Sequence, residues 1–147
     1  MKDYSKDYIV PNFKMTKELI TESICEERKA SHMYDKLAKQ AQRSHERKHL
    51  LSILDDEKKH EQLLFDIYRM LFHSAPNVCD FEPEIIEDYF QVLQKALIDE
   101  TMAIAPFRII LRGLPNMRVY QDMMYEIITD EQKHADKLNF IIMKNAR

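Results

Sequence analysis

The tetrapeptide EKKH at Glu57–His60 returns as EQKH at Glu131–His134, and each copy interrupts an otherwise apolar heptad seam. A single glutamate interrupts another apolar seam about 30 residues before each copy, Glu27 before the first and Glu100 before the second. Four carboxylates and two imidazoles therefore take positions where a helical bundle normally carries Leu or Ile. Burying this much charge without compensation is very costly, and two divalent cations would compensate for it.

Amphipathic helices extend outward from these motifs. Apolar residues recur at steps of three and four, which keeps their side chains on one helical face. Each expected helix has about 28 residues and would be about 40 Å long at 1.5 Å per residue. Four such helices predict an all-α fold, a four-helix bundle. The expected helices cover about residues 16–42, 44–72, 83–112 and 115–144.

Turn-forming residues agree with this division. The chain has one glycine and five prolines in 147 residues, which argues against sandwiches and barrels because those folds need many turns. Gly113 followed by Pro115 predicts one helix end and the next helix start, and Ser44 is a candidate N-cap. Residues 74–82 form the predicted linker, and Pro106 would bend the third helix because it lacks an amide hydrogen.

The composition predicts one soluble domain, with a leader at residues 1–15 and the bundle at residues 16–147. The net charge is −3 with both signs mixed, so we expect no nucleic-acid partner. No segment approaches the roughly 20 apolar residues of a membrane span, and the N-terminus lacks the apolar stretch of a signal peptide. Cys25 and Cys79 form no Cys-x-x-Cys pair, and two such cysteines favour a reducing compartment over a disulfide framework. We therefore expect a cytoplasmic protein.

The two halves of the chain repeat one pattern, which indicates two related helical hairpins. Equivalent residues of the motif are offset by 73, 74 and 74 positions. An antiparallel hairpin brings its two glutamates to similar heights, and the spacing of three places carboxylate and imidazole on one face. Packing the hairpins together would converge six candidate metal ligands: Glu27, Glu57, His60, Glu100, Glu131 and His134.

The charges and ligand types predict the metal. Four ionised glutamates carry −4, which two divalent cations would neutralise. Carboxylate with imidazole suits iron or manganese, whereas structural zinc sites favour Cys and His. A bridging glutamate can hold two metals about 3.5–4 Å apart. The expected cofactors are therefore two iron ions, with manganese as the alternative.

Other polar residues fit the pattern less well. Glu46–His49 has the same spacing, but it lies beside a turn without a counterpart in the second half, so we interpret it as a surface pair. Asp56 and Asp130 precede the motif glutamates and could orient a ligand histidine, although a solvated face is the favoured interpretation. Tyr34 fits either the core or a contact with the ligands. Three histidines are expected at the surface or at helix ends: His32, His45 and His73.

The combined motif resembles the ferritin-like di-iron superfamily, with the greatest similarity to rubrerythrin-type domains and bacterioferritin. It comprises E-x-x-A-x-x-x-Y at residues 27–34, E-x-x-H at 57–60, E-x-x-A at 100–103 and E-x-x-H at 131–134. The resemblance implies that Glu57 and Glu131 bridge two irons. It also implies that Tyr34 lies beside the ligands. The remaining implied ligands are terminal: Glu27 and Glu100, with His60 and His134 on one iron each.

The resemblance implies an oxidoreductase of peroxidase or ferroxidase type, which couples iron oxidation to reduction of H₂O₂ or O₂. Rubrerythrins carry a further glutamate where this chain has Ala103, so the symmetric set of four Glu and two His is expected. No rubredoxin domain is present, so an external protein would donate electrons. No fifth helix follows, which disfavours a large storage cage. The alternatives are an iron-storage accessory protein and a non-catalytic metal-binding bundle.

The topology stays open at this point. The family joins its second and third helices by a crossover along the whole bundle, but nine residues at 74–82 reach only about 30 Å. Frayed helix ends would let the linker reach. Otherwise a homodimer, which we expect, could exchange hairpins between chains, or the bundle could be up-down-up-down.

Overall fold

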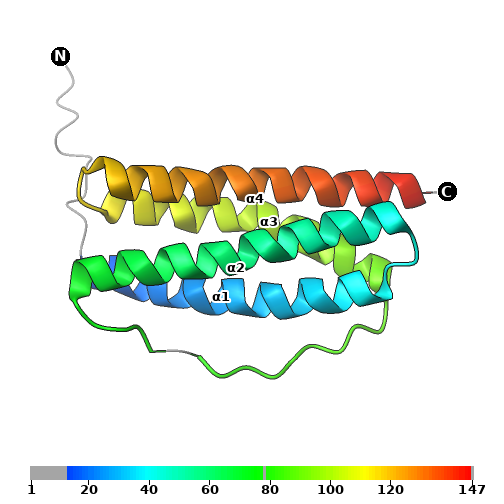
Figure 1. Ribbon diagram of the computed structural model, residues 1–147, viewed down its shortest axis with the longest axis horizontal. Coiled ribbons are helices and arrows are strands. Elements are labelled where there is room, and N and C mark those ends of the chain that lie inside the picture. The colour runs from blue at the N-terminus through cyan, green and yellow to red at the C-terminus, as the bar shows by residue number, and fades with distance from the viewer. Residues whose placement is uncertain (1–12, 78, 147) are drawn as a thin grey trace, which may run out of the picture.

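The computed structural model describes residues 13–77 and 79–146, and this part of the chain forms four α-helices and no β-strand. Helices α1 and α2 pack as one antiparallel hairpin and α3 and α4 as another, and the hairpins lie side by side (Figure 1). The predicted four-helix bundle of two hairpins is confirmed. The leader expected at residues 1–15 falls mostly outside the described residues. The helix bounds are α1 Phe13–Gln40, α2 Ser44–Phe72, α3 Tyr89–Gly113 and α4 Arg118–Asn145.

The predicted start of the third helix is wrong. Helix α3 begins at Tyr89 rather than at Pro83, because the carboxylate of Asp88 accepts a hydrogen bond from the Gln91 amide and caps the helix there. The helix then continues through Pro106 and ends at Gly113 as expected. Helix α2 has the predicted bounds, whereas α1 starts three residues early and α4 starts three residues late.

The apolar seams are confirmed over most of their length. Their central residues on all four helices are buried, including the six candidate ligands. Two residues that the periodicity also places on these seams, Phe90 in the third helix and Met117 in the fourth, are exceptions, with 45% and 55% of their surface exposed. Both lie where a helix begins, so the neighbouring helices do not cover them. Burial is therefore most predictable near the middle of the bundle, where the candidate ligands are.

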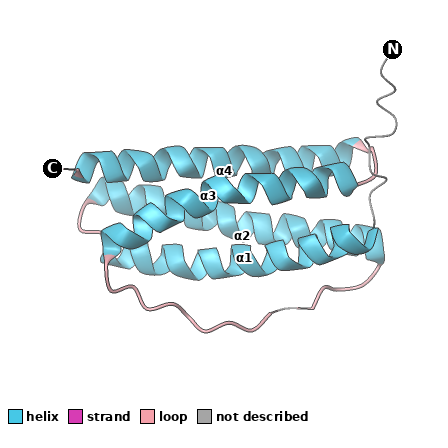
Figure 2. Ribbon diagram, turned by 180° about the vertical axis from the view of Figure 1, so that it is seen from behind, coloured by secondary structure: helices cyan, strands magenta, loops and turns pink. Residues whose placement is uncertain are grey.

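The connection between the hairpins is a crossover that runs the whole length of the bundle beside α1 (Figures 1 and 2). It covers residues 73–88, because α3 starts late, and a segment of that length extends about 50 Å, enough to pass a helix of about 42 Å. Neighbouring helices are consequently antiparallel. The up-down-up-down alternative is wrong for this chain.

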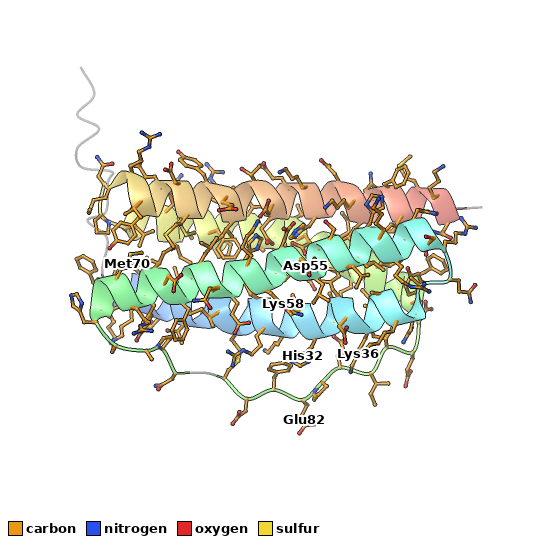
Figure 3. The ribbon with its side chains drawn as sticks, viewed as in Figure 1. His32, Lys36, Asp55, Lys58, Met70 and Glu82 are labelled. Carbon is orange, nitrogen blue, oxygen red and sulfur yellow. A yellow bond between two sulfur atoms is a disulfide. The ribbon has the colours of Figure 1, made fainter. Side chains whose placement is uncertain are left out.

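The crossover is attached to α1. A disulfide joins Cys25 to Cys79, with 5.8 Å between their Cα atoms. Next along the chain, the rings of His32 and Phe81 contact edge to face, with centroids 5.1 Å apart. His32 and Lys36 point from α1 toward the crossover in Figure 3. Two α1 side chains also donate hydrogen bonds to crossover carbonyls: Lys36 to Glu84 and Gln40 to Ile86.

The expectation that the cysteines stay unpaired is wrong. They are 54 residues apart in sequence, and only the path of the crossover brings residue 79 beside residue 25. The argument from cysteine usage to a reducing compartment therefore loses its basis, and the cytoplasmic location stays a prediction. Among the described helices, none is apolar enough over a sufficient length to cross a membrane.

Reduction of the Cys25–Cys79 disulfide should lower the free energy of unfolding by about 2–4 kcal/mol, because the bond restricts a long loop of the unfolded chain. Urea denaturation with and without dithiothreitol measures this difference. The double variant Cys25→Ser with Cys79→Ser is the control and should not respond to the reductant. Equal stability of the parent in both conditions would contradict the prediction.

Candidate metal centre

The candidate ligands form a polar layer between two apolar layers of the bundle. Both apolar clusters contain residues of both hairpins. One cluster includes Ile24, Leu64 and Ile127, and the other includes Leu37, Ile53 and Leu138. Between them lie all six predicted ligands, each with at most 5% of its surface exposed. The predicted convergence of these side chains is therefore found within a single chain. Exchange of hairpins between chains is not needed to assemble the layer.

The six side chains form two overlapping groups that could hold metal ions. Within each group, one ligand atom per residue lies within 4.8 Å of all the others. Glu57 and Glu131 belong to both groups, so they lie at the centre of the site. The groups, found among the described residues, are Glu27, Glu57, His60 and Glu131, and Glu57, Glu100, Glu131 and His134.

The two imidazoles lie face to face at the centre, with ring centroids 5.6 Å apart. Each ring directs Nδ1 toward glutamate oxygens from two other helices. These distances are 3.0 Å from His60 to Glu131 and 3.6 Å to Glu27, and 2.9 Å from His134 to Glu57 and 3.5 Å to Glu100. The rings thus present one nitrogen each to the carboxylate cluster.

Each of the six residues has one buried polar atom without a hydrogen-bond partner among the described side chains. Buried polar groups are normally paired, so six such atoms in one place need an explanation. A cation accepts electron pairs from carboxylate oxygens and from a neutral imidazole nitrogen, and the donor set therefore fits divalent metal ions. The atoms are Glu27 Oε2, Glu57 Oε1, His60 Nδ1, Glu100 Oε2, Glu131 Oε1 and His134 Nδ1.

The outer nitrogen of each imidazole contacts an aspartate on the opposite hairpin. His60 Nε2 lies 2.9 Å from Asp130, and His134 Nε2 lies 2.9 Å from Asp56. The favoured interpretation of both aspartates as solvated is therefore wrong. An aspartate that accepts a hydrogen bond from Nε2–H keeps the proton on that nitrogen and leaves the Nδ1 lone pair free toward the carboxylates, which is the tautomer that a metal needs.

The sequence offered one indication that these aspartates belong to the site, because each directly precedes a motif glutamate. Adjacent residues point in different directions on a helix, so counting along one helix could not show their contact with a histidine on another helix. Lys59 connects them, with its ammonium 2.8 Å from Asp130 and 3.4 Å from Asp56. Burial would raise the pKa of Asp130, but hydrogen bonds from Lys59 and His60 hold it below its ordinary value.

Tyr34 is fully buried and its hydroxyl donates a 2.6 Å hydrogen bond to Glu100. Both interpretations of this residue are therefore correct, since it is part of the core and also contacts a candidate ligand. Burial and the neighbouring Glu100 raise the pKa of the Tyr34 hydroxyl well above its usual value, so it stays protonated. The equivalent residue in the second half is Phe107, which has no hydroxyl for Glu27.

Without a metal, the cluster retains protons. Burial raises the pKa of Glu27 to about 8 and also raises the pKa values of Glu57 and Glu131. Burial acts in the same direction on Glu100, but close contacts with His134 and Glu131 and the hydrogen bond from Tyr34 hold its pKa below the usual value. Burial would lower the pKa of His134, yet contacts with Glu100 and Glu57 raise it to about 9. Metal binding would therefore displace protons.

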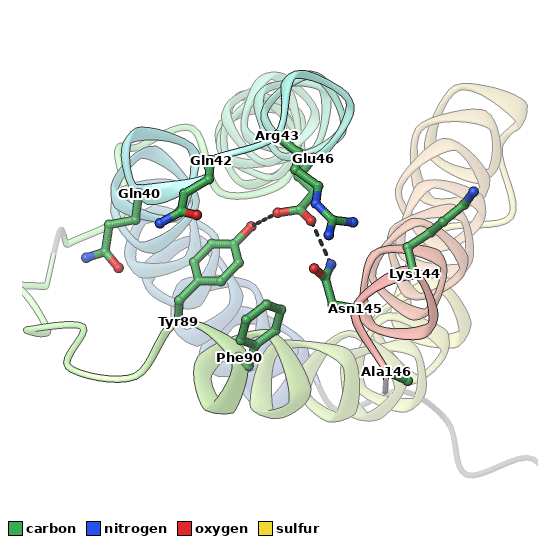
Figure 4. Close-up of a pocket in the computed structure, with 9 residues that line it drawn as sticks. All are labelled: Gln40, Gln42, Arg43, Glu46, Tyr89, Phe90, Lys144, Asn145 and Ala146. Carbon is green, nitrogen blue, oxygen red and sulfur yellow. Dashed lines mark hydrogen bonds between the residues drawn. The ribbon is translucent and has the colours of Figure 1, made fainter.

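Glu46 is not the surface residue expected from the sequence. It is 2% exposed, and its carboxylate accepts hydrogen bonds from Tyr89 at 2.9 Å and Asn145 at 2.6 Å at the end of the bundle (Figure 4). Both oxygens are partnered, in contrast to the four candidate ligand glutamates, each of which has one oxygen without a partner. His49 packs against Phe140 instead of joining Glu46 in a site. The other three histidines are at partly or fully exposed positions, as expected: His32, His45 and His73.

Comparison of the chain with family models, curated proteins and solved structures finds no match. Their arrangement is a buried cluster of glutamate and histidine that could bind metal.

Replacing Glu27 by Gln should stabilise the metal-free protein by about 1–3 kcal/mol at pH 8 and much less at pH 5. The pKa of Glu27 rises from 4.5 to about 8 on folding, so its contribution to stability is present below pH 4.5 and is lost as the pH approaches 8. Denaturation in chelator at both pH values measures the effect. With metal present the sign should reverse, because the variant loses a ligand.

The matched control is Glu46→Gln, which changes a buried carboxylate whose oxygens are both hydrogen-bonded. It should leave the effect of metal on stability unchanged. A Glu27→Gln variant that is destabilised equally with and without metal would contradict the assignment of Glu27 as a ligand.

Asp130→Ala should weaken metal binding about 10–100-fold, because the His60 ring loses the partner that orients it. Competition with a metal-sensitive dye measures the affinity. Glu126→Ala is the control, since Glu126 also contacts Lys59 but not a histidine. Equal affinities for the two variants would indicate that only the charge near Lys59 matters.

Proposed function

We propose that this protein is a non-haem di-iron oxidoreductase that binds two ferrous ions in the bundle core and couples their oxidation to the reduction of peroxide or dioxygen. The observation that carries the proposal is the convergence of six unpartnered ligand atoms on one buried layer.

The charge of the layer supports two divalent ions. Four glutamates contribute −4 when ionised, and the raised pKa values of Glu27, Glu57 and Glu131 indicate that protons replace a missing cation when no metal is bound. The mixture of carboxylate oxygen and imidazole nitrogen favours iron or manganese over a structural zinc ion. The described cysteines are joined to each other, so they do not contribute thiolate ligands.

The roles of the ligands follow from the two overlapping groups. Glu57 and Glu131 belong to both, so they would bridge the two ions. Glu27 and His60 would complete one ion site, and Glu100 with His134 would complete the other. These roles match the resemblance to rubrerythrin-type domains and bacterioferritin.

The bound pair of irons would supply two electrons together to the oxidant. Reduction of hydrogen peroxide to two waters consumes two electrons and two protons. The apolar layers on either side close the site along the bundle axis, and the two aspartates hold the imidazole rings in place. Tyr34 holds a proton at its hydroxyl against Glu100 and keeps that carboxylate in position.

The proposal includes partners. An external electron-donor protein would return the irons to the ferrous state, and the protein would act as a homodimer in the cytoplasm. Light scattering measures the assembly. A much larger particle would favour the alternative function, an iron-storage accessory protein.

Anaerobic protein loaded with two ferrous ions per chain should consume peroxide or dioxygen rapidly on mixing and develop near-ultraviolet absorption from ferric ligands. Oxidant consumption measured with an electrode tests this directly. Glu57→Ala should lose both ions and the reaction, because Glu57 belongs to both candidate groups. Glu46→Gln is the control and should retain both.

Elemental analysis of the native protein separates the alternatives. Two irons per chain without oxidant consumption would point to a non-catalytic metal-binding bundle. Two manganese ions per chain would reassign the metal. Absence of any metal, with none bound on titration, would refute the proposal.

A further inference from the structure

All four ligand glutamates directly follow an acidic residue in the sequence, and the centre described above gives a role to only two of these four acidic residues. Asp56 and Asp130, on α2 and α4, bind the imidazoles. Glu26 and Asp99 are the equivalent residues on α1 and α3, and both are exposed. They lie on the opposite face of the bundle, beside the ligands Glu27 and Glu100.

A cavity of about 570 Å³ opens on this face between α1 and α3. All four ligand glutamates and Tyr34 line it, whereas the lining found among the described residues does not include either imidazole. Each of the four glutamates has a buried oxygen without a hydrogen-bond partner. The cavity therefore connects solvent with the carboxylate side of the centre.

On the opposite face, between α2 and α4, the surface depression does not extend to the candidate ligands. The depression there is lined by Asp56, Lys59, Glu126 and Asp130 among other residues, and the six candidate ligands are absent from its described lining. Lys59 bridges three carboxylates at 2.8–3.4 Å and covers the outer side of the imidazoles. Only the face between α1 and α3 thus gives access to the ligands through the described cavities.

The mouth of the accessible cavity is acidic. Glu26, Glu84 and Asp99 line it together with Lys29 and Lys95, so the formal charge is −1 before the ligand glutamates are counted. Lys29 lies 3.3 Å from Glu26, and Lys95 lies 3.7 Å from Glu84. A cleft whose walls and floor carry negative charge raises the local concentration of cations.

We propose that the cavity between α1 and α3 is the route by which divalent cations reach the centre, and that Glu26 and Asp99 attract them to its mouth. Small side chains keep the route open: Ala30 and Ala103 line it from α1 and α3, three residues after Glu27 and Glu100. The inference rests on the proposed function, because it assumes that the centre binds metal.

The double variant Glu26→Gln with Asp99→Asn should bind cobalt(II) about 3–10-fold more slowly at low ionic strength, with the same final stoichiometry. Stopped-flow absorbance of cobalt(II) in the anaerobic full-length protein measures the rate without any turnover. The difference should shrink at high salt, because mobile ions screen the mouth charges. Glu18→Gln with Glu87→Gln is the matched control, since both residues are exposed and lie outside the cavity lining.

Ala103→Leu tests the same route by size instead of charge. The larger side chain should slow cobalt(II) binding at every salt concentration, while circular dichroism and final stoichiometry stay at the parent values. Parent-like rates in both the charge variant and Ala103→Leu, with full stoichiometry, would overturn the route but leave the proposed function intact. A parent protein that binds no cobalt, manganese or iron would overturn both.

Discussion

The burial of six ionisable side chains between two apolar layers constrains the rest of this bundle. Four carboxylates and two imidazoles lie within a layer that is at most 5% exposed, where isolated charges would be very costly. Each imidazole contacts carboxylates from the other hairpin, as His60 does with Asp130 and Glu131. The polar layer therefore also determines how the hairpins pack, since these contacts form only in one register.

The duplicated hairpins produce a centre whose two faces differ. On α2 and α4 the acidic residue before each glutamate binds an imidazole and Lys59, which closes that face. On α1 and α3 the equivalent acidic residues remain at the mouth of a cavity. Tyr34 adds a further asymmetry, because its counterpart Phe107 cannot donate a hydrogen bond. The two halves of the centre are thus similar in ligands but not in surroundings.

The crossover determines the topology that makes this arrangement possible. By running along α1 it makes all neighbouring helices antiparallel, which places α1 beside α3 and α2 beside α4. The same path brings Cys79 to Cys25, two residues from the candidate ligand Glu27. The crossover also contributes Glu84 to the cavity wall. Fold, disulfide and access to the site therefore share one structural cause.

The sequence alone determined the helical class, the hairpin repeat and the six residues of the buried polar layer, because helical periodicity and motif spacing are local properties that place side chains on one face. It did not determine the start of α3, because the cap at Asp88 makes the helix begin at Tyr89, six residues beyond Pro83. Only the tertiary structure decided the disulfide, the aspartate–histidine contacts and the burial of Glu46. Each of these joins residues on different elements, and periodicity along one helix carries no information about which side chains meet across a helix interface.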